Sequence, residues 1–423
     1  MPSSSLTLLF AAALVVSLLV KLWLATRQMR HVAAHRDEVP APFAGTVSLQ
    51  AHRKAADYTL AKGRLSLLSM AFGAVVVLGW TLLGGLDALN TAVREAVLPR
   101  WGDMAYQLSL LGAFALVSGL LDLPFELYGT FRLEQRFGFN RMTWGLWLKD
   151  TLKGIAVTVV LGLPLAAAVL WIMGAAGDRW WLWAWIVLTA YQLLMMVIVP
   201  LWVMPLFNKF EPLADEGLRE RVQALMKRCG FAAKGLFVMD GSLRSAHSNA
   251  YFTGLGRSKR VVFYDTLLQQ LSPAEVEAVL AHELGHFKHK HVLKRMLGVF
   301  AFSLAALALL GWLANQVWFY AGLGVQPNLD APNDALALLL FMLAVPVFGY
   351  FVSPVLAQLS RRHEFEADAF ACRQASGQAL ANALLKLHED NAGTLTPDPL
   401  YVRFYYSHPP ATERLAALRA AAS

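Results

Sequence analysis

The stretch Ser272–His291 reads SPAEVEAVLAHELGHFKHKH, and the interpretation of the whole chain starts from it. Its opening Ser-Pro-Ala-Glu is typical of a capped helix start, with serine as the cap, proline in the first turn and glutamate returning to the serine backbone. His282 and His286 are four residues apart, so they share one face of that helix. Two such histidines can bind one zinc ion, and the carboxylate of Glu283 can accept a proton from water.

The alternative is an exposed helix that carries histidine and glutamate without a metal. A pattern of this length does arise by chance, but the capped, partly apolar helix around it favours the zinc site. His289 lies two turns beyond His282, too far away to share its ion. We expect His289 and His291 at the surface.

The composition indicates a membrane protein. Of the 423 residues, 57% are hydrophobic and only 16% are charged, against about 25% charged in soluble domains. The two cysteines, Cys229 and Cys372, match no metal-ligand spacing, and we expect them to be unpaired thiols in a reducing compartment. The opening MPSSS lacks the basic region of a signal peptide, so the first apolar stretch is expected to stay in the membrane.

Seven stretches are apolar enough to span a bilayer, which takes about 20 helical residues. They are Leu6–Ala25, Leu65–Leu86, Met104–Leu121, Gly154–Gly177, Trp180–Phe207, Met296–Leu323 and Ala335–Leu359.

The connections between these stretches alternate in charge. The segment from Lys21 to Arg64 is rich in Lys and Arg, whereas the one from Asn315 to Asp334 has none. All but three of the 37 basic residues fall on one side, which is the positive-inside pattern. We therefore expect the amino terminus outside and the Ser272–His291 helix in the cytoplasm. The net charge of +8 then reflects membrane orientation and not binding to nucleic acid.

A soluble insert separates the fifth and sixth spans. Glu216–Cys229 is predicted to be a helix, and Phe237–Met239, Asn249–Gly254 and Val261–Asp265 are predicted to be short strands. Because the Ser272–His291 helix leads into the sixth span, the site must lie near the membrane surface. We divide the chain into an amino-terminal membrane domain with five spans (1–207), the protease insert (208–295), spans six and seven (296–359) and a cytoplasmic tail that completes the zinc site (360–423).

The tail opens with RRHEFEADAF, residues 361–370, which reads as a helix. A catalytic zinc site takes a third protein ligand and leaves the fourth position to water. Glu364 is the best candidate because it follows the last span directly, and Asp368, one turn further on, is placed to orient a ligand imidazole. Glu366 and His363 are expected to be solvated charges at the helix end.

HELGH on a helix that enters a span, together with HEFEADAFA after the last span, resembles the type I CAAX prenyl endopeptidases, which are membrane-embedded zinc metalloproteases. The resemblance runs nearly end to end. Further similar stretches are LPFELY (Leu123–Tyr128), EQRFGFNR (Glu134–Arg141), PLFNKF (Pro205–Phe210), SAHSNAYFTG (Ser245–Gly254), and SHPP (Ser407–Pro410) followed by Glu413 and Arg414.

The resemblance implies an all-α polytopic membrane protein, with seven transmembrane helices around a chamber and a small α+β cytoplasmic zinc metalloprotease domain. It implies one Zn²⁺ per chain, with Glu364 as the third ligand. Asn249 and His408 would contact the scissile peptide or its developing oxyanion, and Arg414 would help to position that part of the site. The plain alternatives are an ordinary edge strand and turn around Asn249 and a capping role for His408.

The expected function is zinc-dependent peptide cleavage, of the CAAX type if the resemblance extends to substrates. The expected partners are a prenylated or membrane-associated peptide or protein and the lipid bilayer, with no nucleic acid. One alternative is a general quality-control protease of the heat-shock membrane endopeptidase type. Another is a membrane scaffold or transporter with structural zinc, against which Glu283 argues because a structural site needs no base. The tail to Ser423 has no basic retrieval signal, so we expect the plasma (inner) membrane.

Overall fold

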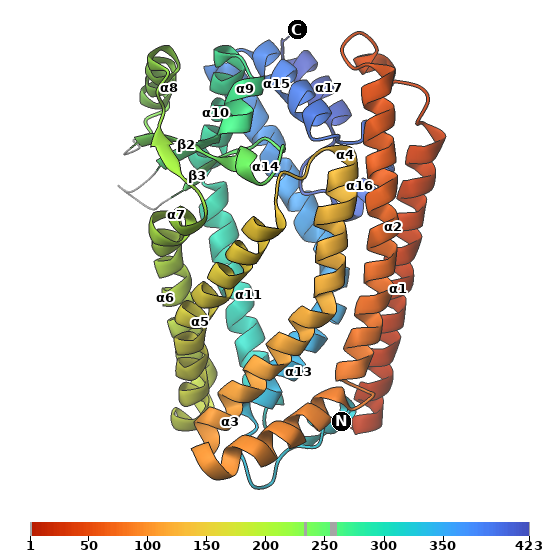
Figure 1. Ribbon diagram of the computed structural model, residues 1–423, viewed down its shortest axis with the longest axis vertical. Coiled ribbons are helices and arrows are strands. Elements are labelled where there is room, and N and C mark those ends of the chain that lie inside the picture. The colour runs from red at the N-terminus through yellow and green to blue at the C-terminus, as the bar shows by residue number, and fades with distance from the viewer. Residues whose placement is uncertain (1, 232–234, 254–259, 423) are drawn as a thin grey trace.

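The computed structural model describes residues 2–231, 235–253 and 260–422 (Figure 1). The amino terminus lies at one end of an elongated molecule, and the small sheet and the carboxy terminus lie at the other. Within the described chain, seven helices are long and apolar enough to cross a membrane, as predicted: Ser3–Ala34, Leu49–Trp80, Gly85–Phe137, Trp144–Ala175, Gly177–Phe207, His291–Leu313 and Asp334–Gln374.

Two pairs of long membrane helices pack in an antiparallel manner. Helix α1 (Ser3–Ala34) packs against α2 (Leu49–Trp80), and α5 (Trp144–Ala175) packs against α6 (Trp180–Ile198). Between the pairs, α3 (Gly85–Tyr128) first crosses the amino-terminal end of the molecule and then rises along it (Figure 1). The bend coincides with Gly102, whose φ of 75° is readily adopted only by glycine.

The predicted spans differ from the helices in their limits. Helix α2 begins at Leu49 and ends at Trp80, well before Leu86. The sixth span ends with α11 (His291–Leu313), and the apolar residues after it form the separate short helix α12 (Val317–Gly322). Hydropathy therefore located the spans but not the turns between them. Helix α13 (Asp334–Gly349) is followed by one tight turn and then by α14 (Ser353–Gln374), so the last span leads straight into the helix with Glu364.

The sheet has four strands in the order β1-β2-β4-β3. Strands β2 (Gly235–Met239), β3 (Ala250–Thr253) and β4 (Arg260–Tyr264) were predicted, whereas the three-residue β1 (Phe210–Pro212) was not. Strands β2 and β4 are parallel, and the other two pairs are antiparallel. Strand β3 is an edge strand. Gly254, the predicted end of this strand, lies outside the described residues.

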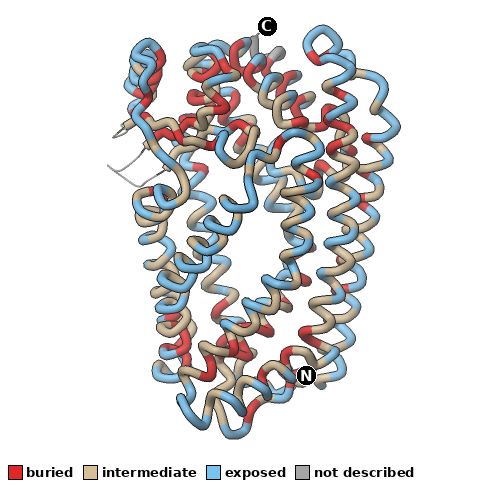
Figure 2. Tube along the Cα trace, in the orientation of Figure 1, coloured by how far each residue is buried: buried red, intermediate tan, exposed pale blue. Residues whose placement is uncertain are grey.

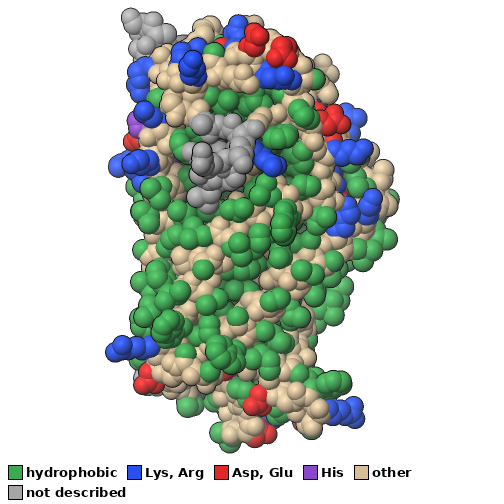
Figure 3. Space-filling view, turned by 90° about the vertical axis from the view of Figure 1, so that its left-hand side faces the viewer, with side chains coloured by type: hydrophobic (Ala, Val, Ile, Leu, Met, Phe, Trp, Pro, Cys, Tyr) green, Lys and Arg blue, Asp and Glu red, His purple; other side chains and the backbone are tan. Residues whose placement is uncertain are grey.

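The helices around the sheet enclose one hydrophobic core, and the membrane helices enclose another toward the end of the molecule where the amino terminus lies. Figure 2 shows these buried residues gathered toward the two ends of the molecule. A broad apolar surface lies between the charged ends in Figure 3, as expected for a membrane-spanning body. The remaining helices are α4 (Gln135–Phe137), α7 (Met204–Phe207), α8 (Glu216–Arg228), α9 (Asp265–Gln270), α10 (Pro273–Lys288), α15 (Gly377–Asp390), α16 (Pro399–Tyr405) and α17 (Ala411–Ala422).

Candidate active site

Helix α10 begins as the sequence predicts. The side chains and backbones of Ser272 and Glu275 form a capping box, with the serine N–H donating to Glu275 Oε2 at 2.7 Å. Lys386 of α15 also donates to this oxygen, at 2.8 Å. Burial raises the pKa of Glu275, but these hydrogen bonds outweigh burial and hold the pKa below its usual range. The first turn of the helix is thus fixed against α15.

Helices α10 and α14 approach each other closely at Gly285, the glycine of HELGH. A Cβ atom at this position would lie 2.9 Å from the Cα atom of Ala367 and 3.0 Å from its carbonyl oxygen. Only glycine fits this contact without a shift of one helix. The close approach brings Glu364 of α14 to the face of α10 that carries the two histidines.

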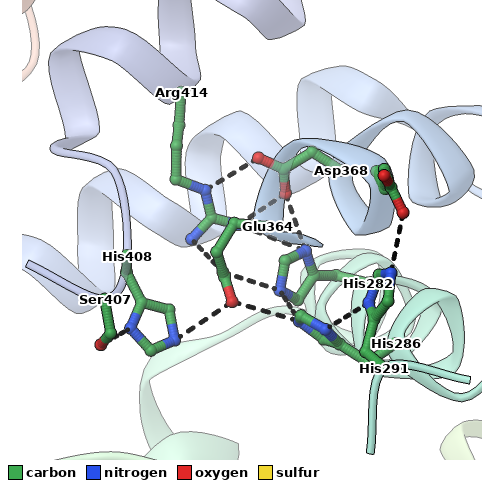
Figure 4. Close-up of polar contacts among 9 residues, drawn as sticks. His282, His286, His291, Glu364, Asp368, Ser407, His408 and Arg414 are labelled. Carbon is green, nitrogen blue, oxygen red and sulfur yellow. Dashed lines mark hydrogen bonds and ion pairs between the residues drawn. The ribbon is translucent and has the colours of Figure 1, made fainter. Parts of the chain in front are cut away.

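The three predicted ligands meet at one point (Figure 4). The Nε2 atom of His282 lies 3.4 Å from Glu364 Oε2, and the Nε2 atom of His286 lies 3.3 Å from Glu364 Oε1. The two Nε2 atoms are 3.2 Å apart. Among the described residues these three side chains form a group whose ligand atoms, all within 4.8 Å of one another, could hold one metal ion.

The other ring nitrogen of His282 is held by Asp368, as expected. Its Nδ1 atom lies 2.7 Å from Asp368 Oδ1 (Figure 4). Arg414 of α17, which is also buried, donates from Nε to Asp368 Oδ2 at 2.8 Å. Burial lowers the pKa of His282, but the neighbouring carboxylates of Asp368 and Glu364 outweigh burial and raise it. Arg414 also lies 3.3 Å from Nδ1 of His282 and 3.9 Å from Glu364 Oε2, so it contacts two of the predicted ligands as well as Asp368.

His286 is held by two residues that were expected at the surface. Its Nδ1 atom lies 3.0 Å from Nδ1 of His291, whose Nε2 atom lies 2.8 Å from Glu366 Oε2. His291 is buried because Lys290, with a φ of 56°, separates α10 from α11 and turns the new helix back toward His286. The ring of His363 stacks on His291 with centroids 4.0 Å apart.

The surface assignment of His291 is therefore wrong, because this residue is 4% exposed. Glu366 is exposed, as expected, and both it and the half-buried His363 contact His291. His289 is half-buried, with its ring stacked on His291. The signal in the sequence was the run of histidines directly after HELGH, but nothing in that run indicates where α10 ends.

These hydrogen bonds select the ring tautomers. Glu366 can only accept, so His291 donates from Nε2 and accepts at Nδ1, and His286 must then donate from Nδ1. His282 likewise donates from Nδ1 to Asp368. Both Nε2 lone pairs are left facing Glu364, whose buried Oε2 atom has no hydrogen-bond partner in the described chain. This donor set, two imidazole nitrogens and a carboxylate, fits a zinc ion.

The remaining predicted residues lie at different distances from the cluster. His408, in the loop after α16, places Nε2 at 3.3 Å from Glu364 Oε1, and its side chain is mostly exposed. Glu283 is half-buried and makes no hydrogen bond or ion pair within the described ranges. Asn249 precedes β3 and accepts from the N–H of Ala250 at 2.8 Å, and no contact in the described chain joins it to the cluster.

Comparison with known proteins gives matches along nearly the whole chain. The profile of the CAAX prenyl protease amino-terminal region, with five membrane helices, matches residues 28–209, and the profile of peptidase family M48 matches residues 212–422. The CAAX prenyl protease 1 homolog of Arabidopsis thaliana is 35% identical over 411 residues, which cover 96% of this chain and 95% of that protein. The human homolog is 32% identical over 455 residues, covering 97% and 95%.

The fold agrees with these matches. The crystal structure of S. mikatae Ste24p superposes with a TM-score of 0.91 at 30% identity, covering 99% of this chain and 100% of that one. CAAX prenyl protease 1 of Saccharomyces cerevisiae is 33% identical over 384 residues, 86% of this chain and 85% of the yeast protein. The expected fold class, enzyme class and zinc dependence are thereby confirmed. The chain belongs to the CAAX prenyl protease 1 family of membrane-embedded M48 zinc metalloendopeptidases.

Proposed function

We propose that this metalloendopeptidase cleaves prenylated CAAX proteins after the modified cysteine. The observation that carries the proposal is the convergence of His282, His286 and Glu364 at the end of a membrane-spanning body, next to an edge strand. A site in this position can reach substrates that are themselves held at a membrane. The relatives that match most of the chain are named as CAAX prenyl proteases, which supports the substrate class.

His282, His286 and Glu364 are the proposed zinc ligands. When bound, zinc activates water and polarises the peptide carbonyl. The chain itself holds the ligands in place: Asp368 fixes one imidazole, and His291 fixes the other. Both contacts direct Nε2 toward Glu364.

Glu283 is the proposed general base. It follows His282 directly in the chain, and its half-buried carboxylate has no competing partner in the described ranges. A free carboxylate next to a ligand can take a proton from the attacking water and pass it to the leaving amine. A structural metal site would have no use for such a group.

The edge of β3 is the proposed binding surface for the peptide. An edge strand has unpaired backbone N–H and C=O groups, which can pair with an extended substrate and fix its register. Strand β3 also packs against α10, which carries the two histidines. Asn249 at the start of the strand and His408 beside Glu364 are the proposed contacts to the scissile peptide and its developing negative charge.

We also propose that the site faces the cytoplasm. Arg94, Arg100 and Arg179 are the three basic residues expected outside, and they lie in α3 and in the connection between α5 and α6. The first part of α3, before its bend, and the connection between α5 and α6 are at the end of the molecule opposite the sheet (Figure 1). The charge asymmetry then supports a cytoplasmic protease end.

The test compares a farnesylated CAAX peptide with the same peptide unmodified, using purified protein and mass spectrometry of the products. We expect cleavage after the farnesylated cysteine, loss of activity with a chelator and recovery with added zinc. Equal cleavage of both peptides, with many internal cuts in misfolded membrane proteins, would identify a quality-control protease instead. An absence of cleavage with zinc bound would identify a scaffold.

A further inference from the structure

A cavity of about 660 Å³ lies among α1, α2, α3 and α13, away from the zinc-ligand cluster. Its walls are mainly apolar and include Leu14, Leu18, Leu65, Phe125 and Val347. We call this cavity the α2 slot. The lining residues of α2 run from Lys62 to Val77, which corresponds to a depth of about 22 Å at about 1.5 Å per residue.

One end of the α2 slot is polar. Lys21 of α1, Lys62 of α2 and Glu134 line it there. The Nζ atom of Lys21 lies 4.8 Å from the centroid of the Tyr350 ring, and that of Lys62 lies 4.9 Å from the centroid of the Tyr58 ring. Neither lysine has an ion pair within 4 Å among the described residues. Lys62 donates to the Tyr58 hydroxyl at 3.4 Å, whereas Lys21 makes no hydrogen bond in the described chain and is the cation best placed to meet an anionic group.

The same end adjoins the candidate active site along two routes. On one side, the hydroxyl groups of Tyr350 and Tyr405 are 2.9 Å apart, and Tyr405 precedes His408 by three residues. On the other side, Glu134 Oε2 lies 3.5 Å from Nε2 of His247, which precedes Asn249 by two residues. The polar end is therefore connected by contacts to both segments that we assign to substrate contact.

We propose that the α2 slot binds the isoprenoid tail of the substrate. This inference rests on the proposed function, because the tail is attached to the cysteine just before the scissile bond. An apolar tail that starts at the active site must be kept from water, and this cavity offers apolar walls from the edge of the site down into the membrane body. The residues that are cut off end in the substrate's carboxylate, so a negative charge arrives together with the tail. Lys21 and Lys62 lie at the end where that charge would be.

Gly73 allows the α2 slot to be narrowed without disturbing the fold. It lines the slot, and a Cβ atom there would meet no other atom within 4 Å. Leucine also has a higher helix propensity than glycine, so Gly73→Leu should not unfold α2. Gly112 of α3 is the matched control because its Cβ position is equally open and it is not among the residues that line the slot.

The experiment measures kcat/KM for a farnesylated CAAX peptide and for its unmodified counterpart. We expect Gly73→Leu to lower the preference for the farnesylated peptide about tenfold or more, mainly through KM, and Gly112→Leu to keep the wild-type preference. If Gly73→Leu keeps the wild-type preference, the assignment of the α2 slot to the isoprenoid tail is refuted and the proposed function stands. If the wild-type protein cleaves both peptides equally, the slot assignment and the proposed function are both refuted.

A photoreactive farnesyl peptide provides the second readout. Its crosslinks should map to α2 near Gly73 and should be displaced by excess farnesylated peptide. Displacement by phosphatidylglycerol vesicles and not by the peptide would show that the slot holds a bilayer lipid, which would refute the assignment.

Discussion

Replacing His291 by phenylalanine tests whether the second imidazole holds a zinc ligand. The ring and its stacking on His363 are kept, but the acceptor for the Nδ1–H group of His286 is removed. His286 would then lose the contact that directs Nε2 toward Glu364. Changing the hydrogen-bond partner of a metal ligand typically weakens metal binding about 10–100-fold, which corresponds to about 1.4–2.8 kcal/mol.

The structure also predicts how these substitutions rank in their effect on zinc affinity. Glu364→Ala removes a ligand and should weaken zinc binding most. Glu366→Ala should weaken zinc binding less than His291→Phe, by about 1 kcal/mol or less, because the Glu366 side chain is 48% exposed and water can replace it.

The assay is competition for zinc with a chromophoric chelator, with circular dichroism as a check on folding. His363→Phe is the control, since that residue stacks on His291 without bonding to His286. Wild-type zinc affinity in His291→Phe would refute the reasoning. Equal losses in both variants would show that ring packing, and not the hydrogen bond, supports the ligand.

Three other expectations follow from the described contacts. Gly285→Ala should force α10 and α14 apart, lower the stability of the fold by about 1–3 kcal/mol and lower the zinc content. The control Gly298→Ala, at an open position on α11, should leave zinc binding intact. Glu275→Gln should lower the stability of the protein by about 1 kcal/mol at neutral pH; because the folded pKa of Glu275 is depressed, the difference from wild type should vanish as the pH falls through that pKa. Tags at Glu38 and Leu329, both exposed, should be accessible from the cytoplasm and from outside, respectively, and accessibility from one face only would refute the seven-span topology.

The sequence was informative where a periodic pattern determines geometry. The four-residue spacing in HELGH placed both histidines on one face, and the helix phase after the last span separated Glu364 from Glu366. The expected contact between Asp368 and His282 is present in the structure. The apolar stretches identified seven membrane helices in the described chain.

Features that depend on a single backbone angle or on tertiary contacts could not be predicted from a sequence pattern. Lys290 adopts a left-handed conformation that is unusual for a lysine, and this one residue decides that His291 is buried. The part of α3 before its break at Gly102 lies outside the predicted span Met104–Leu121 and was treated only as a connection. Strand β1 is too short to show an alternating pattern, and it exists because it pairs with β2.

The central claim is that the cluster is a catalytic centre and that Glu283 is its base. Glu283→Gln keeps the size of the side chain but cannot accept a proton at neutral pH, while His282, His286 and Glu364 remain to bind zinc. The decisive measurement is the zinc content and the single-turnover cleavage rate of this variant on one preparation. We expect zinc at wild-type occupancy and a rate lower by about 10²–10⁴-fold. A variant that retains zinc and cleaves at the wild-type rate would contradict the account.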